Sequence, residues 1–233
     1  MYIDKHYPFE MVKLDYSLTS FEPYLDFKTL SIHYNQIYKN YVEKLNNALN
    51  GLDTLHSLCL DELLFNDMLI PISKRELVIN NASGAYNHQI IFKSITPNPI
   101  VQISNSLKNA IEKKYTSLNN FFVEFKKACL NLSGCGFVFL VCNEQGDVFI
   151  ESVKGNTTTV KKNLCPIIGI DLFEHAYFLK YGIDKEKIVL VEDLNNLIKD
   201  VKENSVGDIY TMVCFDMTAN ILRLLEEDEN EKN

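Results

Sequence analysis

Two long stretches of helical periodicity near the start of the chain constrain its fold more than any other feature of the sequence. Apolar and aromatic side chains recur at helical spacing from Asp26 to Gly51, and a second helical pattern runs from Ser73 to about Ile95. The connector between them, residues 52–70, mixes polar and apolar side chains. Because consecutive elements of a chain tend to lie side by side, the sequence predicts a long antiparallel helical hairpin in its N-terminal part.

The segment Thr96-Pro97-Asn98-Pro99 interrupts this pattern and is the best candidate for a domain boundary. We therefore expect a helical-hairpin domain over residues 1–97, which begins with an irregular arm over residues 1–26. We expect an α/β domain over residues 98–225, and we expect the acidic residues 226–233 to form a disordered tail.

The second part of the chain mixes helical and strand patterns. Gly134 and Gly136 end a helical pattern, and two apolar runs separated by a turn signal then predict a β-hairpin. With a third short strand after it, the sequence predicts an α+β fold, in which the helical hairpin precedes an α/β domain with a three-stranded antiparallel sheet. The expected helices cover residues 102–114, 116–131, 174–181, 192–203 and 207–225, and the expected strands cover residues 137–142, 148–153 and 166–170.

Charge, hydropathy and cysteine usage exclude several classes of partner. The net charge is −8 and no basic stripe is present, which argues against a nucleic-acid partner. No apolar run reaches the roughly 18 residues of a membrane-spanning helix, and Met1 to Pro8 resembles neither a signal peptide nor a transit peptide. The six cysteines include no C-x-x-C pair, so we expect buried, reduced thiols in a cytoplasmic protein without a membrane partner.

Three of the five histidines and one aspartate form the pattern that carries chemistry. His33 and His88 lie mid-way along two helical stretches that are expected to be neighbours, and Asp171 and His175 lie one helical turn apart. Three imidazoles and one carboxylate suit a redox-capable first-row ion such as iron or manganese. Each histidine alone is more often a hydrogen-bonded core residue, and the segment from Asp171 to His175 can also be a capped helix start. The joint pattern is what favours a metal site.

The stretch from Asp171 to Phe178, which reads DLFEHAYF, fits the D-x-[WF]-E-H-[STA]-[FY]-[FY] signature of the iron/manganese superoxide dismutases at every position. Other segments resemble the same family in order and spacing over about residues 8–181, and the resemblance fades from Gly182 onward. These segments are residues 31–34, 39–42 and 45–47 in the first helix, residues 80–82 and 87–88 in the second, and residues 133–141 in the first strand.

The resemblance implies a fold, a metal site and an activity. The fold is the helical hairpin followed by the α/β domain, and the reaction is the disproportionation of superoxide to dioxygen and hydrogen peroxide. One manganese or iron ion per subunit would also carry a water or hydroxide as a fifth ligand. The protein ligands implied by the resemblance are His33, His88, Asp171 and His175.

The resemblance also implies residues around the ion and an assembly. Tyr41 matches the family's gateway tyrosine, which relays protons through the bound solvent. The family forms homodimers, some of which pair into tetramers, and Glu174 of one subunit would hydrogen-bond His175 of the other.

Several positions depart from the family pattern. Ile37 replaces a histidine at the mouth of the site, and Phe178 replaces the tyrosine that would bond it, so both partners of one hydrogen bond are missing together. Gly84 stands where iron-type members often carry a glutamine, which favours manganese. Manganese-type members supply that glutamine from the sheet hairpin, where this chain offers the shorter Asn156.

Two other hypotheses remain open. A catalytically weak or inactive structural or binding protein on the same fold is one, although all four ligand positions and Tyr41 are present and the chain is acidic. A different non-haem metalloenzyme, such as an oxygenase, is the other; such sites commonly use fewer protein ligands and leave positions open. The choice between manganese and iron, the rate, the choice between dimer and tetramer, and the role of the divergent C-terminal region are left undecided by the sequence.

Overall fold

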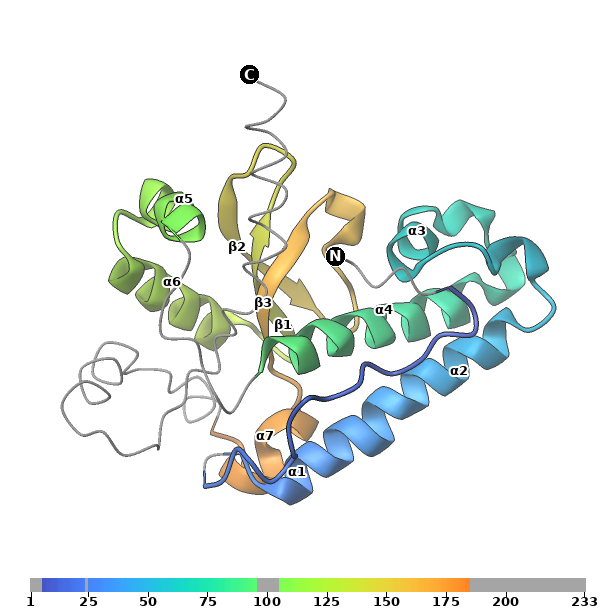
Figure 1. Ribbon diagram of the computed structural model, residues 1–233, viewed down its shortest axis with the longest axis horizontal. Helices are drawn as coiled ribbons and strands as arrows, with labels where there is room; N and C mark the ends of the chain where they lie inside the picture. Colours follow the sequence, from blue (N-terminus) through green and yellow to red (C-terminus); the bar gives the residue numbers. More distant parts are fainter. Residues whose placement is uncertain (1–5, 24, 96–104, 185–233) are drawn as a thin grey trace.

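The computed structural model describes residues 6–23, 25–95 and 105–184 (Figure 1). A helical part and a mixed part follow one another, and the sheet lies between the long helix α4 and the helices α5 and α6 (Figure 1). The helices are α1 (Phe27–Ile32), a π-helix (His33–Tyr38), α2 (Lys39–Leu49), α3 (Leu60–Phe65), α4 (Ile72–Ser94), α5 (Asn105–Tyr115), α6 (Leu118–Asn131) and α7 (Glu174–Tyr181), with 3-10 turns at Asp53–Leu55, Asp67–Leu69 and Val160–Lys162. The strands are β1 (Gly136–Cys142), β2 (Val148–Lys154) and β3 (Cys165–Asp171).

The first predicted helix is present as α1, the π-helix and α2 in direct succession. Asp26 caps it, because its carboxylate accepts a hydrogen bond from the Thr29 N–H at 2.9 Å. The π-helix was not predicted. It begins at His33 and closes wider turns than an α-helix, so it changes the direction in which the following side chains point.

The second predicted helix is α4, which packs against α2 to form the expected hairpin. It begins at Ile72 rather than at Ser73, and no side chain caps this end, where Pro71 has an extended backbone. The connector also contains the helix α3, which was not predicted. Its leucines are buried in the core of the hairpin, and this packing stabilises the helix.

The arm over residues 6–23 has no helix or strand, and hydrogen bonds fasten it along the hairpin. Asn46 exchanges two hydrogen bonds with the backbone of Phe9, at 2.8 and 2.9 Å. Further along, the Val12 carbonyl accepts a hydrogen bond from the Tyr34 hydroxyl, and the Val12 N–H donates to the Tyr38 hydroxyl at 3.2 Å. Both tyrosines belong to the π-helix, so the arm is held directly over the segment that carries His33.

The sheet has the predicted three antiparallel strands, in the order β2-β1-β3. Every residue of the central strand β1 is buried, because helices cover both faces of the sheet. Phe137, Phe139 and Val141 join the core beneath the hairpin, whereas the alternate residues face α5 and α6. The predicted α+β fold class is therefore confirmed.

Some expectations lie outside the described residues: the domain boundary near residue 97, the helical patterns at 192–203 and 207–225, the tail at 226–233, and Cys214. The other five cysteines are reduced, as predicted, since none of them forms a disulfide. The prediction that they are buried is wrong for three of them, because Cys59, Cys135 and Cys165 are only half-buried. None of the helices in the described ranges is long and apolar enough to cross a membrane.

Candidate metal centre

Four elements of the fold each bring one side chain to a common point. His33 comes from the start of the π-helix, His88 from the buried middle of α4, Asp171 from the end of β3, and His175 from the first turn of α7. One donor atom from each of the four residues lies within 4.8 Å of the other three. The structure therefore brings the four predicted ligands together, and their role as metal ligands stays a prediction.

The two oxygens of Asp171 have different surroundings. Its Oδ1 atom accepts a hydrogen bond from the Phe173 N–H at 2.8 Å, which fixes the rotation of the carboxylate. Its Oδ2 atom faces the imidazoles and lies 3.2 Å from the Nε2 atoms of both His33 and His175. The Nε2 atom of His88 is 3.9 Å away. One oxygen is thus held by the backbone, and the other is directed to the point where the histidines meet.

The tautomer of His88 follows from its backbone partner. Its Nδ1 atom lies 2.7 Å from the carbonyl oxygen of Gly84, which can only accept, so Nδ1 carries the hydrogen. The Nε2 atom then has a free lone pair. Within the described residues the Nε2 atoms of His33 and His88 are buried and make no hydrogen bond, although that of His33 lies at ion-pair distance from Asp171 Oδ2. A buried polar atom without a partner costs about 1–3 kcal/mol, and a metal ion at this point would remove that cost.

The charge at the site also fits a cation. Burial lowers the pKa of His33, and burial together with His33 lowers the pKa of His88 to about 3, so both imidazoles are neutral, as metal ligands must be. Burial alone would raise the pKa of Asp171, but the imidazoles of His175 and His33 outweigh it and hold this pKa well below its usual range. The site therefore buries a carboxylate beside neutral nitrogen donors, an arrangement that a positive ion stabilises.

Aromatic side chains line the four residues. Phe92 contacts His33 at 4.9 Å between ring centroids, Phe173 stacks on His175 at 5.3 Å, and Tyr38 stacks on His88 at 5.9 Å with an angle of 11° between the rings. The role of Tyr38 was not predicted from the sequence. Its spacing of four residues from Tyr34 was the available signal, because it places both hydroxyls beside the same stretch of the arm.

Known proteins match the chain over most of its length. The family model of the iron/manganese superoxide dismutases matches in two parts: the α-hairpin domain over residues 8–96 and the C-terminal domain over residues 103–222. The chain belongs to the iron/manganese superoxide dismutase family. The family resemblance predicted from the DLFEHAYF stretch and the helical segments is thereby confirmed.

Individual members of the superoxide dismutase family are similar to the chain at about one third identity. The manganese superoxide dismutase of Thermus thermophilus is 31% identical over 175 residues, which are 75% of this chain and 86% of the relative. The manganese superoxide dismutase of Listeria ivanovii is 34% identical over 173 residues, 74% of this chain and 85% of the relative. That of Buchnera aphidicola is also 34% identical, over 72% of this chain and 84% of the relative.

Tyr41 and Gly84, which the superoxide dismutase resemblance singled out, lie against each other. A Cβ atom built on Gly84 would lie 2.4 to 2.6 Å from three ring atoms of Tyr41, so only glycine leaves room for the ring there. Tyr41 is half-buried, its ring centroid lies 5.2 Å from that of His88, and burial raises the pKa of its hydroxyl. Tyr41 therefore sits beside the candidate metal centre with its proton retained.

Of the other four predicted residues, three share a helix with one of the donors and the fourth contacts α4. Ile37 is half-buried in the π-helix, and Phe178 is half-exposed on α7. Glu174 is exposed and directly precedes His175. The amide of Asn156 donates a hydrogen bond to the Asn80 carbonyl at 2.6 Å, and its Oδ1 atom is buried without a hydrogen-bond partner among the described residues. The amide nitrogen is thus engaged by α4, one turn before Gly84.

Proposed function

We propose that this superoxide dismutase binds one manganese ion through His33, His88, Asp171 and His175 and disproportionates superoxide to dioxygen and hydrogen peroxide. The observation that carries the proposal is the convergence of four donor atoms, two of which are buried imidazole nitrogens without another partner in the described chain. An ion about 2.1 Å from each donor needs those donors no more than about 4.2 Å apart, so a small inward shift of the side chains is enough.

The ion would supply the redox couple that takes an electron from one superoxide and gives it to the next. The protein would hold the donors, keep the imidazoles neutral and exclude water with the ring wall of Tyr38, Phe92 and Phe173. Peroxide also needs two protons, and we assign the delivery of protons to Tyr41, whose hydroxyl remains protonated and whose ring lies beside His88.

Two features support manganese over iron. The similar proteins named above are manganese superoxide dismutases. Gly84 leaves no side chain at the position where a glutamine would favour iron, and the ring of Tyr41 occupies that space. The test is to remove the metal, reload the protein with manganese or with iron, and compare the superoxide turnover per bound ion. Higher turnover with iron would overturn the choice of manganese but not the activity.

An inactive member of the same fold is the second candidate. The four retained donors, the two buried imidazole nitrogens that make no hydrogen bond in the described chain, and the ring of Tyr41 beside His88 favour the enzyme. The manganese-loaded protein should disproportionate superoxide faster than the same concentration of free manganese. Turnover no higher than that of free manganese would support the inactive candidate.

Tyr41→Phe should leave the metal content unchanged and lower the turnover about a hundredfold where proton delivery limits the rate, because a positioned proton donor contributes about that much. Metal content and turnover across pH would be measured on both proteins. Tyr115→Phe is the matched control, because it also removes a tyrosine hydroxyl. That hydroxyl lies away from the site and accepts a hydrogen bond of 2.9 Å from the Ile150 N–H. A Tyr41→Phe protein equal to wild type at every pH would show that protons travel by another route.

We further propose a cytoplasmic homodimer in which Glu174 contacts His175 of the partner subunit. Glu174 is exposed in the single chain and is one residue from the metal centre, so a two-fold axis nearby would place each glutamate at the other site. The reduced state of the five described cysteines supports a reducing compartment. Pairing of two dimers into a tetramer is an additional outcome that the same measurement would detect.

Wild type should sediment at twice the 26.8 kDa chain mass, or at four times that mass as a tetramer. Glu174→Gln should weaken the dimer about thirtyfold, since removing one partner of a buried charged hydrogen bond costs about 2 kcal/mol or more. The matched control is Glu124→Gln, which removes an exposed carboxylate on α6 that pairs only with Lys127 among the contacts of the described residues. A wild type that stays monomeric at all concentrations would contradict the proposed assembly.

A further inference from the structure

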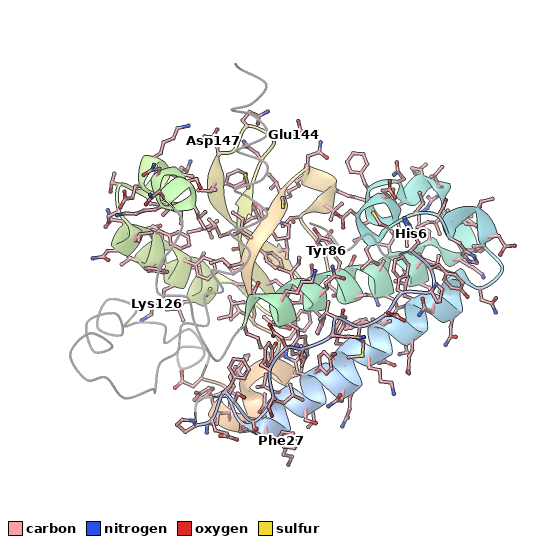
Figure 2. All side chains as sticks on the ribbon, viewed as in Figure 1. His6, Phe27, Tyr86, Lys126, Glu144 and Asp147 are labelled. Atoms are coloured by element: carbon pink, nitrogen blue, oxygen red, sulfur yellow. The ribbon has the colours of Figure 1, made fainter. Side chains whose placement is uncertain are left out.

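Two cysteines are paired on neighbouring strands of the sheet, at the end away from the metal centre. Cys142 is the last residue of β1, and its partner in the antiparallel register is Cys165, the first residue of β3. The opposite end of β1 carries Phe137, whose ring lies 6.1 Å from that of His88. The cysteine pair instead lies next to the turn that contains Glu144 and Asp147, both labelled in Figure 2.

An irregularity in the sheet creates this pairing. Up to Leu140 the strands pair in one register, with Leu140 opposite Ile168. Continued unchanged, that register would place Pro166 opposite Cys142. The register shifts by one residue between Leu140 and Val141, and Cys165 takes that place.

The spacing of paired residues suits a disulfide. Residues directly opposite each other on antiparallel strands have side chains on the same face and Cα atoms about 4.5–5.5 Å apart. Disulfides need a Cα separation of about 4.4–6.8 Å, so the strands already hold the two backbones at a suitable distance. Neither cysteine forms a disulfide in the structure.

The two thiols differ in access to solvent. Cys142 is buried among apolar side chains of the sheet and of α5 and α6, and its Sγ donates a hydrogen bond to the Asn143 carbonyl at 3.2 Å. Burial raises the pKa of the Cys142 thiol to about 11, with a smaller effect from the neighbouring Cys165. Cys165 is half-buried, so a small dissolved oxidant reaches Cys165 first.

We propose that Cys165 and Cys142 form a reversible disulfide in response to hydrogen peroxide, the product of the enzyme's own reaction. The Cys165 sulfur attacks one oxygen of the peroxide, the O–O bond breaks, and the departing hydroxide takes the thiol proton to become water. The resulting sulfenic acid of Cys165 is then attacked by the Cys142 sulfur. The S–S bond forms, the S–O bond breaks, and the hydroxyl leaves with the Cys142 proton as a second water.

In total, the two sulfurs lose two electrons and the two peroxide oxygens gain them. The bond would tie the start of β3 to the central strand, and β3 ends at Asp171. Thiol reductants of the cytoplasm would reverse it by exchange, since a partly exposed disulfide is accessible to them. Only the source of the peroxide rests on the proposed function, because the site itself responds to peroxide from any origin.

The experiment adds hydrogen peroxide directly to the reduced, metal-loaded protein and measures intact mass and cross-linked peptides. We expect a loss of two hydrogen atoms, a cross-link between the peptides of Cys142 and Cys165, a melting temperature raised by several degrees, and full reversal by dithiothreitol. Because peroxide is supplied, the result is independent of superoxide turnover, and a failure of that activity would not be confused with a failure of this site.

Single variants distinguish Cys165, the thiol that peroxide oxidises first, from Cys142, the thiol that then forms the disulfide. Cys142→Ser should stop at a sulfenic acid on Cys165 that dimedone traps, whereas Cys165→Ser should leave Cys142 unmodified, since Cys142 is the buried partner. The matched control Cys59→Ser removes another half-buried thiol and should retain the cross-link. Oxidation confined to Cys59 or Cys135, or a disulfide that links two chains in place of this pair, would overturn the proposal.

Discussion

Asp171→Ala should yield a protein without bound metal and without superoxide turnover. The substitution removes the one carboxylate among the four donors, and with it the negative charge that faces three imidazole nitrogens at 3.2, 3.2 and 3.9 Å. Ligand loss of this kind removes most of the binding free energy, since neutral nitrogens alone do not balance the charge of the ion. Metal analysis after dialysis, together with turnover, measures the effect.

Asp171→Asn separates the loss of charge from the loss of structure. Asparagine keeps an oxygen for the Phe173 N–H, which bonds Asp171 Oδ1 at 2.8 Å, but it carries no charge. We expect its metal-free form to melt within a few degrees of the metal-free wild type, while its metal content falls as in Asp171→Ala. The control Asp147→Ala removes an exposed carboxylate bound to Lys113 and should retain the ion. A fully loaded, active Asp171→Asn protein would show that the carboxylate charge is not needed.

Gly84→Ala should reduce both stability and turnover strongly. The added Cβ atom would lie 2.4 Å from the nearest ring atom of Tyr41, a distance that real structures do not show, so the ring or the two helices must move. Forcing extra volume into a packed core costs about 1–3 kcal/mol, which lowers the melting temperature by several degrees. Displacement of the ring should also lower turnover at least as much as Tyr41→Phe.

A double-mutant cycle tests whether the clash with the Tyr41 ring causes the loss of stability in Gly84→Ala. Tyr41→Leu removes the ring, so adding Gly84→Ala to that variant should cost much less stability than adding it to wild type. Thermal unfolding of the four proteins gives the coupling between the two positions. Equal costs in both backgrounds, or a Gly84→Ala protein as stable and active as wild type, would show that the contact with Tyr41 does not constrain this position.

The chain's helices, strands and chemically important residues could be predicted from its sequence because their signals are local. Helical spacing located the hairpin, the cap at Asp26 depends on one side chain and one backbone N–H, and two apolar runs around a turn signal located β1 and β2. The DLFEHAYF stretch carries the family because its residues are consecutive. The helix α3 was not predicted, and α4 begins one residue earlier than predicted; the leucines of α3 are held in place by packing in the core, which no local pattern indicates.

Contacts between residues that are far apart in the sequence could be found only from the tertiary structure. Only the fold shows that the Gly84 carbonyl fixes the tautomer of His88, that Tyr38 and Tyr34 hold Val12 over the site, and that the π-helix begins at His33. The facing of Cys142 and Cys165 depends on a one-residue shift of register, which no local pattern reveals. The sequence by itself determined which donors the chain has, and the tertiary structure decided which atoms meet and which stay unpaired. The physical reason is that covalent spacing sets neighbours along the chain, whereas contacts across it arise from packing the whole core.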